Sequence, residues 1–277
     1  MKKIAMIVNF EKENSLEAAL RLIDALKGRA DMYSDLSGED RLPLPALEDK
    51  ELFELCPTVV TLGGDGTIIN TAGRCAPYGN ILIGINLGRL GFLTTVEAER
   101  ADAAADFILS DVEFRERTML SCRIVYADGS LSPVSHALND IVVSRGAGRL
   151  HHIEAHMDNR LLTRVRADGL VIATPTGSTA YSLSAGGPIV SPDMDLFVLS
   201  PICPHNLSAR PMVLPTDKVI TLSTKGEAVV TVDGLNLGSF AEGDRVEVRR
   251  SPYITRLAVS PGNDFYELVR KKLTSNL

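Results

Sequence analysis

The hydrophobic pattern of this chain changes once, near residue 113, and this change limits the possible folds more than any other feature. Before it, the continuous apolar runs 3–8, 58–62 and 81–85 alternate with segments of helical spacing at 14–28, around 68–72 and near 97–109. Continuous apolar strands between helices are typical of a parallel sheet covered on both faces. We therefore predict a doubly wound, mostly parallel α/β domain over residues 1–112.

The first helix of this domain can be predicted in detail. Asn14 and Glu17 have the spacing of a capping box, and Gly28 marks the end of the helix. We expect its apolar face to consist of Leu16, Ala19, Leu20, Ile23 and Leu26.

After residue 113 the pattern has a period of two, which is typical of strands. The alternating apolar positions begin with Leu120, Cys122, Ile124 and Tyr126. Turn dipeptides follow at Asp128-Gly129, Asp158-Asn159, Lys225-Gly226 and Asp233-Gly234. We predict a β-rich, all-β domain over residues 113–261, arranged as a meander, and a last helix from Asp264 to Leu273.

Composition and charge exclude several classes of protein. Of the 277 residues, 45% are hydrophobic and 23% are charged, as in an ordinary globular chain, and the formal net charge is −6. A mildly acidic chain has no basic field to attract nucleic acid or an anionic membrane, and no apolar run reaches the roughly 18–20 residues of a membrane span. The cysteines form no C-x-x-C pair, so we expect four buried thiols in a cytoplasmic protein. They are Cys56, Cys75, Cys122 and Cys203.

A glycine-rich segment, Gly63-Gly64-Asp65-Gly66-Thr67, follows an apolar strand and opens a helix. Backbone N–H groups and the helix dipole favour phosphate at such a place. The chain contains no P-loop, and Ile69 replaces the third glycine of a dinucleotide fingerprint. The segment therefore predicts a phosphate site of another kind.

Asp65 is the unexpected member of this segment, because phosphate repels a carboxylate. A carboxylate placed there is explained if it accepts a proton, bonds a hydroxyl group or holds a metal. Alternatively, Asp-Gly and Gly-Gly are simply good turn residues between a strand and a helix.

Three further groups are candidates for ligand contacts, each with a plainer alternative. Phe92 could stack on a flat ring or be a core aromatic under a loop. The seven hydroxyl side chains in 174–184 could bind phosphate and sugar, or lie in a solvated loop. Asn139-Asp140 interrupts an apolar strand, so its burial requires a ligand ribose or a backbone hydrogen bond. The histidines lack the spacing of metal ligands, and we predict no protein metal site.

Taken in order, these motifs resemble those of the NAD kinases, which transfer a phosphoryl group to the 2′-hydroxyl of the adenosine ribose of NAD. The first motif also occurs in lipid kinases and phosphofructokinases, whereas the long T-P-T-G-S-T-A-Y block is specific in combination with the rest. The matching segments span most of 1–265 and are Gly63–Thr67, Asn86–Leu93, Asn139-Asp140, Asp168–Leu170, Thr174–Tyr181, Ser184–Ile189, Pro201–His205 and Val232–Gly234.

The resemblance implies two domains, a last helix at 262–277 that returns to the first domain, an interdomain NAD site, and a homodimer or homotetramer. By match, Asp65 is the base for the ribose hydroxyl, Phe92 lines the dinucleotide site, and Asn139 and Asp140 bind ribose hydroxyls. The other residues implied to bind nucleotide are Gly63, Gly64, Gly66, Thr67, Thr176, Thr179, Ala180, Tyr181 and Ser184, with Arg166 and Asp168 facing the same cleft.

The implied reaction combines NAD with ATP or polyphosphate, and Mg²⁺ or another divalent cation arrives on the phosphoryl donor. Many family members have Asn-Glu where this chain has Asn139-Asp140, so the carboxylate here is one methylene shorter. Two alternatives remain. One is a lipid kinase of the diacylglycerol or sphingosine type, and the other is a dinucleotide-sensing protein that binds NAD without converting it.

Overall fold

The chain folds into two compact units, each with a hydrophobic core of its own. The computed structural model describes residues 1–88, 91–97, 101–145, 151–206, 208–259 and 264–273. The first unit contains Met1–Glu116 together with Thr255–Leu277, and the second contains Arg117–Ile254.

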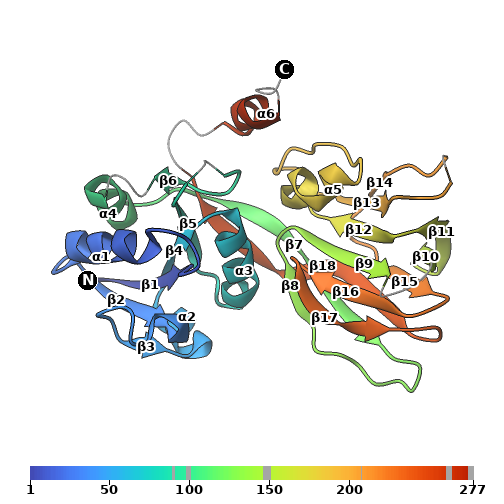
Figure 1. The fold of residues 1–277 in the computed structure, drawn as a ribbon, viewed down its shortest axis with the longest axis horizontal. Helices are drawn as coiled ribbons and strands as arrows, with labels where there is room; N and C mark the ends of the chain where they lie inside the picture. Colours follow the sequence, from blue (N-terminus) through green and yellow to red (C-terminus); the bar gives the residue numbers. More distant parts are fainter. Residues whose placement is uncertain (89–90, 98–100, 146–150, 207, 260–263, 274–277) are drawn as a thin grey trace. The chain divides into compact units, whose positions relative to one another are not determined.

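The first unit is built on a parallel sheet with the strand order β3-β2-β1-β4-β5 (Figure 1). Its strands are β1 Lys2–Val8, β2 Ala30–Asp35, β3 Ala46–Leu47, β4 Thr58–Gly63 and β5 Ile81–Asn86, with β6 Val96–Glu97 beside β5. Its helices are α1 Ser15–Leu26, α2 Asp49–Leu55, α3 Asp65–Cys75, α4 Ala101–Leu109 and α6 Phe265–Leu273, with 3₁₀ turns η1 Leu36–Gly38 and η2 Ala76–Tyr78. The predicted parallel α/β arrangement is confirmed.

Helices cover both faces of this sheet. Alternate residues of β1, namely Ile4, Met6 and Val8, pack in one core with α1 and α4. The intervening Ala5 and Ile7 are also buried, on the face where α2 and α3 contact β1 (Figure 1). Because neither face of the strand is exposed to water from Ile4 to Val8, these residues form a continuous apolar run.

Three loops leave the sheet at the same edge, and two of them carry candidate motifs. The register pairs Gly63, at the end of β4, with Asn86, at the end of β5. The loop after β1 begins there too, since the Asn9 N–H donates to the Leu62 carbonyl at 3.0 Å. The carboxyl ends of parallel strands are a common position for ligand sites.

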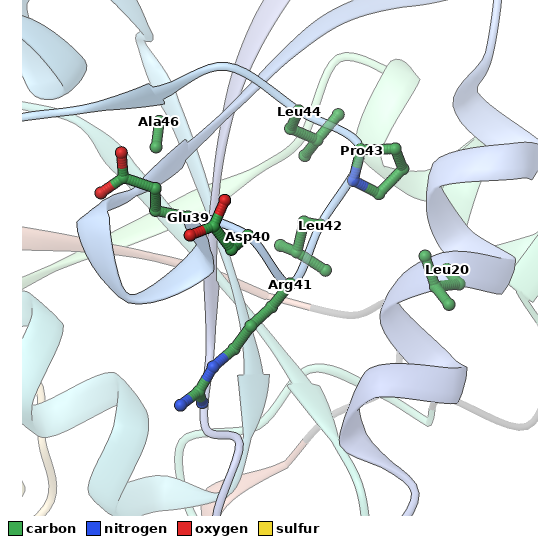
Figure 2. Close-up of a pocket in the computed structure, with 8 residues that line it drawn as sticks. All are labelled: Leu20, Glu39, Asp40, Arg41, Leu42, Pro43, Leu44 and Ala46. Carbon is green, nitrogen blue, oxygen red and sulfur yellow. The ribbon is translucent and has the colours of Figure 1, made fainter.

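Helix α1 differs from its prediction in two respects. Asn14 has a φ of 60° and its side chain makes no cap hydrogen bond, so the expected capping box with Glu17 is wrong. Leu16 and Leu20 are 42% and 41% exposed, whereas the buried face consists of Ser15, Ala19, Leu22, Ile23 and Leu26. Leu20 lies at the border of the apolar stripe, where it lines a pocket of about 640 Å³ together with residues 39–44 and Ala46 (Figure 2).

Strand β2 and helix α2 have no counterpart among the predicted elements. Half of β2 is polar, with the sequence ADMYSD, so it lacks the apolar run of a central strand. Helix α2 has seven residues, too few to establish a helical period, and only Leu52 and Phe53 of it are buried.

The second unit has two largely antiparallel sheets. One sheet has the strand order β14-β13-β12-β9-β16-β17. The other contains the order β11-β10-β15-β18, to which β7 is added beside β18 and β8 beside β7. The strands are β7 Phe114–Val125, β8 Ser135–Ala137, β9 Asp140–Arg145, β10 His151–Met157, β11 Arg160–Ala167, β12 Gly169–Ala173, β13 Phe197–Ile202, β14 Met212–Leu214, β15 Ile220–Thr224, β16 Ala228–Val232, β17 Leu235–Phe240 and β18 Arg245–Ala258. Two short helices, η3 Thr176–Thr179 and α5 Tyr181–Ser184, follow β12. One core contains side chains of both sheets.

The predicted β-rich class of this unit is confirmed, but the expected meander is wrong. Strand β9 lies between β12 and β16, which are its neighbours in space and not in the sequence. The alternation of Leu120, Cys122 and Ile124 determines which face of a strand is buried. It does not determine which strand lies alongside, because register and pairing depend on distant residues.

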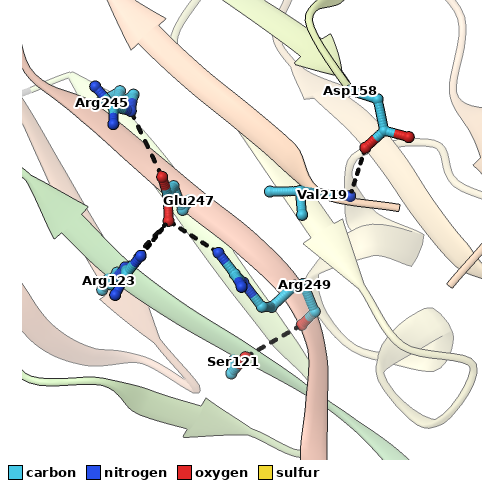
Figure 3. A network of polar contacts seen from close by, with 7 residues as sticks. All are labelled: Ser121, Arg123, Asp158, Val219, Arg245, Glu247 and Arg249. Atoms are coloured by element: carbon cyan, nitrogen blue, oxygen red, sulfur yellow. Dashed lines mark hydrogen bonds and ion pairs between the residues drawn. The ribbon is translucent and has the colours of Figure 1, made fainter. Parts of the chain in front are cut away.

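The face of β7 and β18 that points away from the core carries a charged cluster (Figure 3). Glu247 accepts hydrogen bonds from Arg123 at 2.8 Å and from Arg249 at 2.9 Å, and Arg245 lies 3.6 Å away. Partial burial acts to raise the pKa of Glu247, but the arginines lower it overall. The cluster therefore joins neighbouring strands electrostatically.

The cysteines correct one expectation from composition. Cys56, Cys75 and Cys122 are buried, and burial raises the pKa of each thiol. Cys203 is exposed, because it follows β13 in a turn with a φ of 45°. Separately, no helix among the described residues combines the length and the apolar character needed to cross a bilayer.

Candidate functional site

The glycine loop of the first unit forms the start of α3. Strand β4 ends at Gly63, Gly64 is the N-cap residue, and Asp65 is the first residue of an 11-residue helix. The Gly64 N–H donates to Thr67 Oγ1 at 3.4 Å. The Thr67 N–H donates to the Gly64 carbonyl at 3.0 Å, whereas the N–H groups of Asp65 and Gly66 have no carbonyl partner within the helix, so these two can bind an anion.

The carboxylate of Asp65 joins α3 to the segment after β5. Its Oδ2 accepts the N–H of Phe92 at 2.8 Å, and its Oδ1 accepts the N–H of Leu93 at 3.0 Å. A carboxylate has about four acceptor positions, so two remain for another group. Asp65 is half-buried, and its two hydrogen bonds show that it is more than a turn residue. Its role as a base stays a prediction.

Phe92 is half-buried and lies against α6. Its ring centroid is 6.5 Å from that of Phe265, and the Lys272 ammonium lies 4.7 Å from the centre of the Phe92 ring. This arrangement differs from a core aromatic covered by a loop. Arg89 and Leu90 of the same motif lie outside the described residues.

Lys12 is a charged residue beside the glycine loop that no sequence motif indicates. A β-carbon on Gly64 would lie 2.9 Å from the Lys12 ammonium, so the cation is next to the N-cap of α3. The only sequence signal for it is that Lys12 follows β1, at the same sheet edge as the glycine loop. A cation at this position attracts a bound anion by direct charge interaction.

In the second unit, Asn139 and Asp140 lie where the chain enters β9. Both are buried, with 8% and 6% of their surface exposed. Both of their carbonyls accept backbone hydrogen bonds: the Thr174 N–H donates to the Asn139 carbonyl at 2.8 Å, and the Asp233 N–H donates to the Asp140 carbonyl at 2.9 Å. The Thr174 hydroxyl donates to the preceding carbonyl, that of Leu138, at 2.6 Å. No hydrogen bond among the described residues uses either side chain, so both can serve a ligand.

Asp233 is the residue next to this pair that sequence reasoning did not place in the site. Its Oδ1 accepts the N–H groups of Asn139 and Asp140, and its Oδ2 accepts that of Leu138. Burial, and then the charge of Asp233, raise the pKa of Asp140 to about 7. Burial also raises the pKa of Asp233 to about 6, although the three amides act to lower it.

The hydroxyl-rich segment is not a solvated loop. Thr174, Ser178 and Ser182 are fully buried, and their hydroxyls bond Leu138, Val190 and Ser200 inside the unit. These three are therefore structural. Among the predicted contacts, Thr176 is buried, Thr179 and Ala180 are half-buried, and Tyr181 and Ser184 are exposed.

The two remaining predicted residues lie near β12. Arg166 is exposed on β11, and its carbonyl accepts the N–H of His205 at 2.8 Å. Asp168, between β11 and β12, is 3.1 Å from Arg145 in an ion pair. Across the part of the chain that the structure describes, no three His, Cys, Asp or Glu side chains are grouped as metal ligands.

Two family models match this chain. Residues 46–112 match the ATP-NAD kinase N-terminal domain, and residues 138–259 match the ATP-NAD kinase C-terminal domain. Among curated proteins, an NAD kinase of Heliobacterium modesticaldum is 41% identical, and one of Symbiobacterium thermophilum is 38% identical. Each alignment covers 99% of this chain and 99% of the relative.

Two solved structures are similar over the length of the chain. Yeast NADH kinase in complex with NADH has a TM-score of 0.90 at 28% identity, covering 100% of this chain and 88% of that one. An NAD kinase from Archaeoglobus fulgidus in complex with ATP has a TM-score of 0.76 at 26% identity, covering 99% of each chain.

Proposed function

The chain belongs to the NAD kinase family, and from this membership we propose that it transfers a phosphoryl group from ATP or polyphosphate to the 2′-hydroxyl of the adenosine ribose of NAD. The observation that carries the proposal is the glycine loop, with a carboxylate at the first position of α3 and Lys12 beside it. Amides and a cation suit a phosphate chain, and the carboxylate suits an alcohol that must lose its proton.

We assign roles in NAD binding to the candidate residues of each unit. Asp65 would accept the proton of the 2′-hydroxyl or orient that hydroxyl, and Phe92 would line the dinucleotide site. Asn139 and Asp140, whose side chains have no hydrogen-bond partner among the described residues, would bind ribose hydroxyls. Adenine and ribose would be surrounded by Thr176, Thr179, Ala180, Tyr181 and Ser184, near Arg166 and Asp168.

A divalent cation, Mg²⁺ in the first instance, would enter on the phosphates of the donor. Mg²⁺ usually keeps several waters and binds through one or two carboxylates plus substrate phosphates. Asp65 is a carboxylate of this kind, because it lies at the glycine loop with acceptor positions to spare. The cation would neutralise charge on the transferred group.

The lipid kinase alternative is not favoured, because the full-length relatives are NAD kinases. The other alternative, a dinucleotide-sensing protein, would bind NAD without forming NADP.

We also propose that the protein acts in the cytoplasm as a homodimer or homotetramer.

The purified protein is expected to form NADP from NAD, Mg²⁺ and at least one of the two donors, and to leave diacylglycerol unphosphorylated. A coupled assay with an NADP-specific dehydrogenase measures the first, and radioactive ATP measures the second. Chelation with EDTA should lower NADP formation by at least about 100-fold, and added Mg²⁺ should restore it. The proposal would be contradicted if the protein bound NAD but formed no NADP, or if it transferred the radioactive label to the lipid.

Two glycines of the loop lead to opposite expectations. A β-carbon on Gly63 would lie 2.1 Å from Thr67 Oγ1, so Gly63→Ala should lower the free energy of unfolding by ~1–3 kcal/mol. A β-carbon on Gly66 would meet no atom within 4 Å. Gly66→Ala should therefore leave stability intact and lower kcat/KM for the donor by ~10–100-fold, because the methyl group blocks a bound phosphate.

Urea unfolding and steady-state kinetics on the same two proteins check this pair of expectations. Unchanged kcat/KM in Gly66→Ala would mean that phosphate does not approach the loop at this residue.

A further inference from the structure

One carboxylate fixes the segment that carries Asn139 and Asp140. Asp233, in the turn between β16 and β17, accepts the N–H of Leu138 at 2.7 Å. The same carboxylate accepts the N–H groups of Asn139 at 2.9 Å and of Asp140 at 3.0 Å. In return, the Asp233 N–H donates to the Asp140 carbonyl at 2.9 Å. Three consecutive amides thus depend on a single side chain.

The conformation of this turn does not itself require a carboxylate. Asp233 and Gly234 have φ angles of 49° and 83°, as in a type I′ turn, where Asn or Gly serves equally well. Asp158 and Asn159 form a similar turn between β10 and β11, with φ angles of 46° and 66°. The Asp158 carboxylate, however, accepts a single backbone N–H, that of Val219 at 3.3 Å (Figure 3).

A second carboxylate close to Asp140 is electrostatically unfavourable, because like charges disfavour ionisation. The Asp233 carboxylate compensates for this through its hydrogen bonds, because hydrogen bonds to an ionised acceptor are about twice as strong as neutral ones. Thr174 holds the same segment from the other side, through the carbonyls of Leu138 and Asn139. With N–H and carbonyl groups satisfied, the side chains of Asn139 and Asp140 are not needed to bond their own backbone.

We propose that Asp233 is a positioning residue, which holds the main chain of Leu138–Asp140 so that the side chains of Asn139 and Asp140 are free to bind the nucleotide. This inference rests on the proposed function, since it takes the ribose of NAD as the ligand. Asp233 acts through its neighbours and needs no contact with the substrate.

Amide hydrogen exchange tests the structural half of the proposal without any substrate. Asp233→Asn keeps the size and the turn preference, but its NH₂ group must face at least one of the backbone N–H groups. The amides of Leu138–Asp140 are expected to exchange at least about tenfold faster in Asp233→Asn. Asp158→Asn, the matched change in the other turn, should leave them at the wild-type rate.

Kinetics test the functional half. Asp233→Asn is expected to raise KM for NAD by about tenfold and to change kcat by less than about threefold, because binding and not the chemical step is affected. Asp158→Asn should change neither constant. Asp233→Glu keeps two acceptor oxygens, so its KM for NAD should lie between those of wild type and Asp233→Asn. If Asp233→Asn does not fold, Asp233→Glu replaces it in both the exchange and the kinetic experiment.

The outcomes separate the possible failures. Unchanged exchange in Asp233→Asn would overturn the proposal, and so would faster exchange with an unchanged KM, which would leave Asp233 a purely structural residue. A wild-type protein that forms no NADP would overturn the proposed function, and this inference with it. Faster exchange together with a raised KM supports the positioning role.

Discussion

Replacement of Asp65 by Asn is expected to lower the turnover of NAD by about 10²–10⁴-fold, the usual contribution of a general base. The amide is similar in size and still offers one oxygen to the N–H groups of Phe92 and Leu93, which Asp65 now binds. It cannot take up the proton of a hydroxyl group. Steady-state NADP formation measures the loss, and calorimetry should still detect NAD binding.

Glu51→Gln is the matched control for the lost charge. Glu51 is an exposed acid in the first turn of α2, so it interacts with a helix dipole as Asp65 does, but it is not part of the glycine loop. Each substitution should lose about 0.3–1 kcal/mol of favourable interaction with a helix dipole. Asp65→Asn also weakens the hydrogen bonds from Phe92 and Leu93, and only Asp65→Asn should slow the reaction. Near-normal turnover in Asp65→Asn would leave Asp65 as a link between α3 and the segment after β5.

The parallel sheet could be predicted because its central strands are buried on both faces. Strands β1, β4 and β5 are therefore mostly apolar, and contiguous residues carry the signal. The border of the buried face of α1 could not be predicted in the same way. Whether Leu20 is covered depends on the path of residues 39–46, which are far from it in the sequence.

The same distinction applies to the candidate site. The glycine loop could be located because strand, glycines and helix follow one another in the chain. The bonds from Phe92 and Leu93 to Asp65 join residues 27 and 28 positions apart, and no pattern records them. Asp233 lies in a matching segment, but its role could not be predicted for a related reason: Asp-Gly is already explained as a turn, and its amide partners lie 93 to 95 positions away.

Asp140→Asn is expected to stabilise the protein increasingly as the pH rises from 4 to about 7. Burial and the charge of Asp233 raise the pKa of Asp140 in the folded protein from 3.8 to about 7. Between these values the unfolded chain has already released the proton that the folded protein retains. The stability due to this group is therefore full below pH 4 and is lost towards pH 7, by a total of about 4 kcal/mol. Urea unfolding at pH 4.5, 6 and 8 measures it.

Asp128→Asn separates this effect from the general removal of a carboxylate. Hydrogen bonds from Ser130 lower the pKa of the exposed Asp128, so its titration lies below this range and should add no slope between pH 5 and 8. A stability difference between Asp140→Asn and wild type that stays constant over that range would mean that Asp140 is ionised throughout. If the ribose hydroxyls donate to the Asp140 carboxylate, the wild-type KM for NAD should also rise as the pH falls below 7, because the neutral acid is the weaker acceptor.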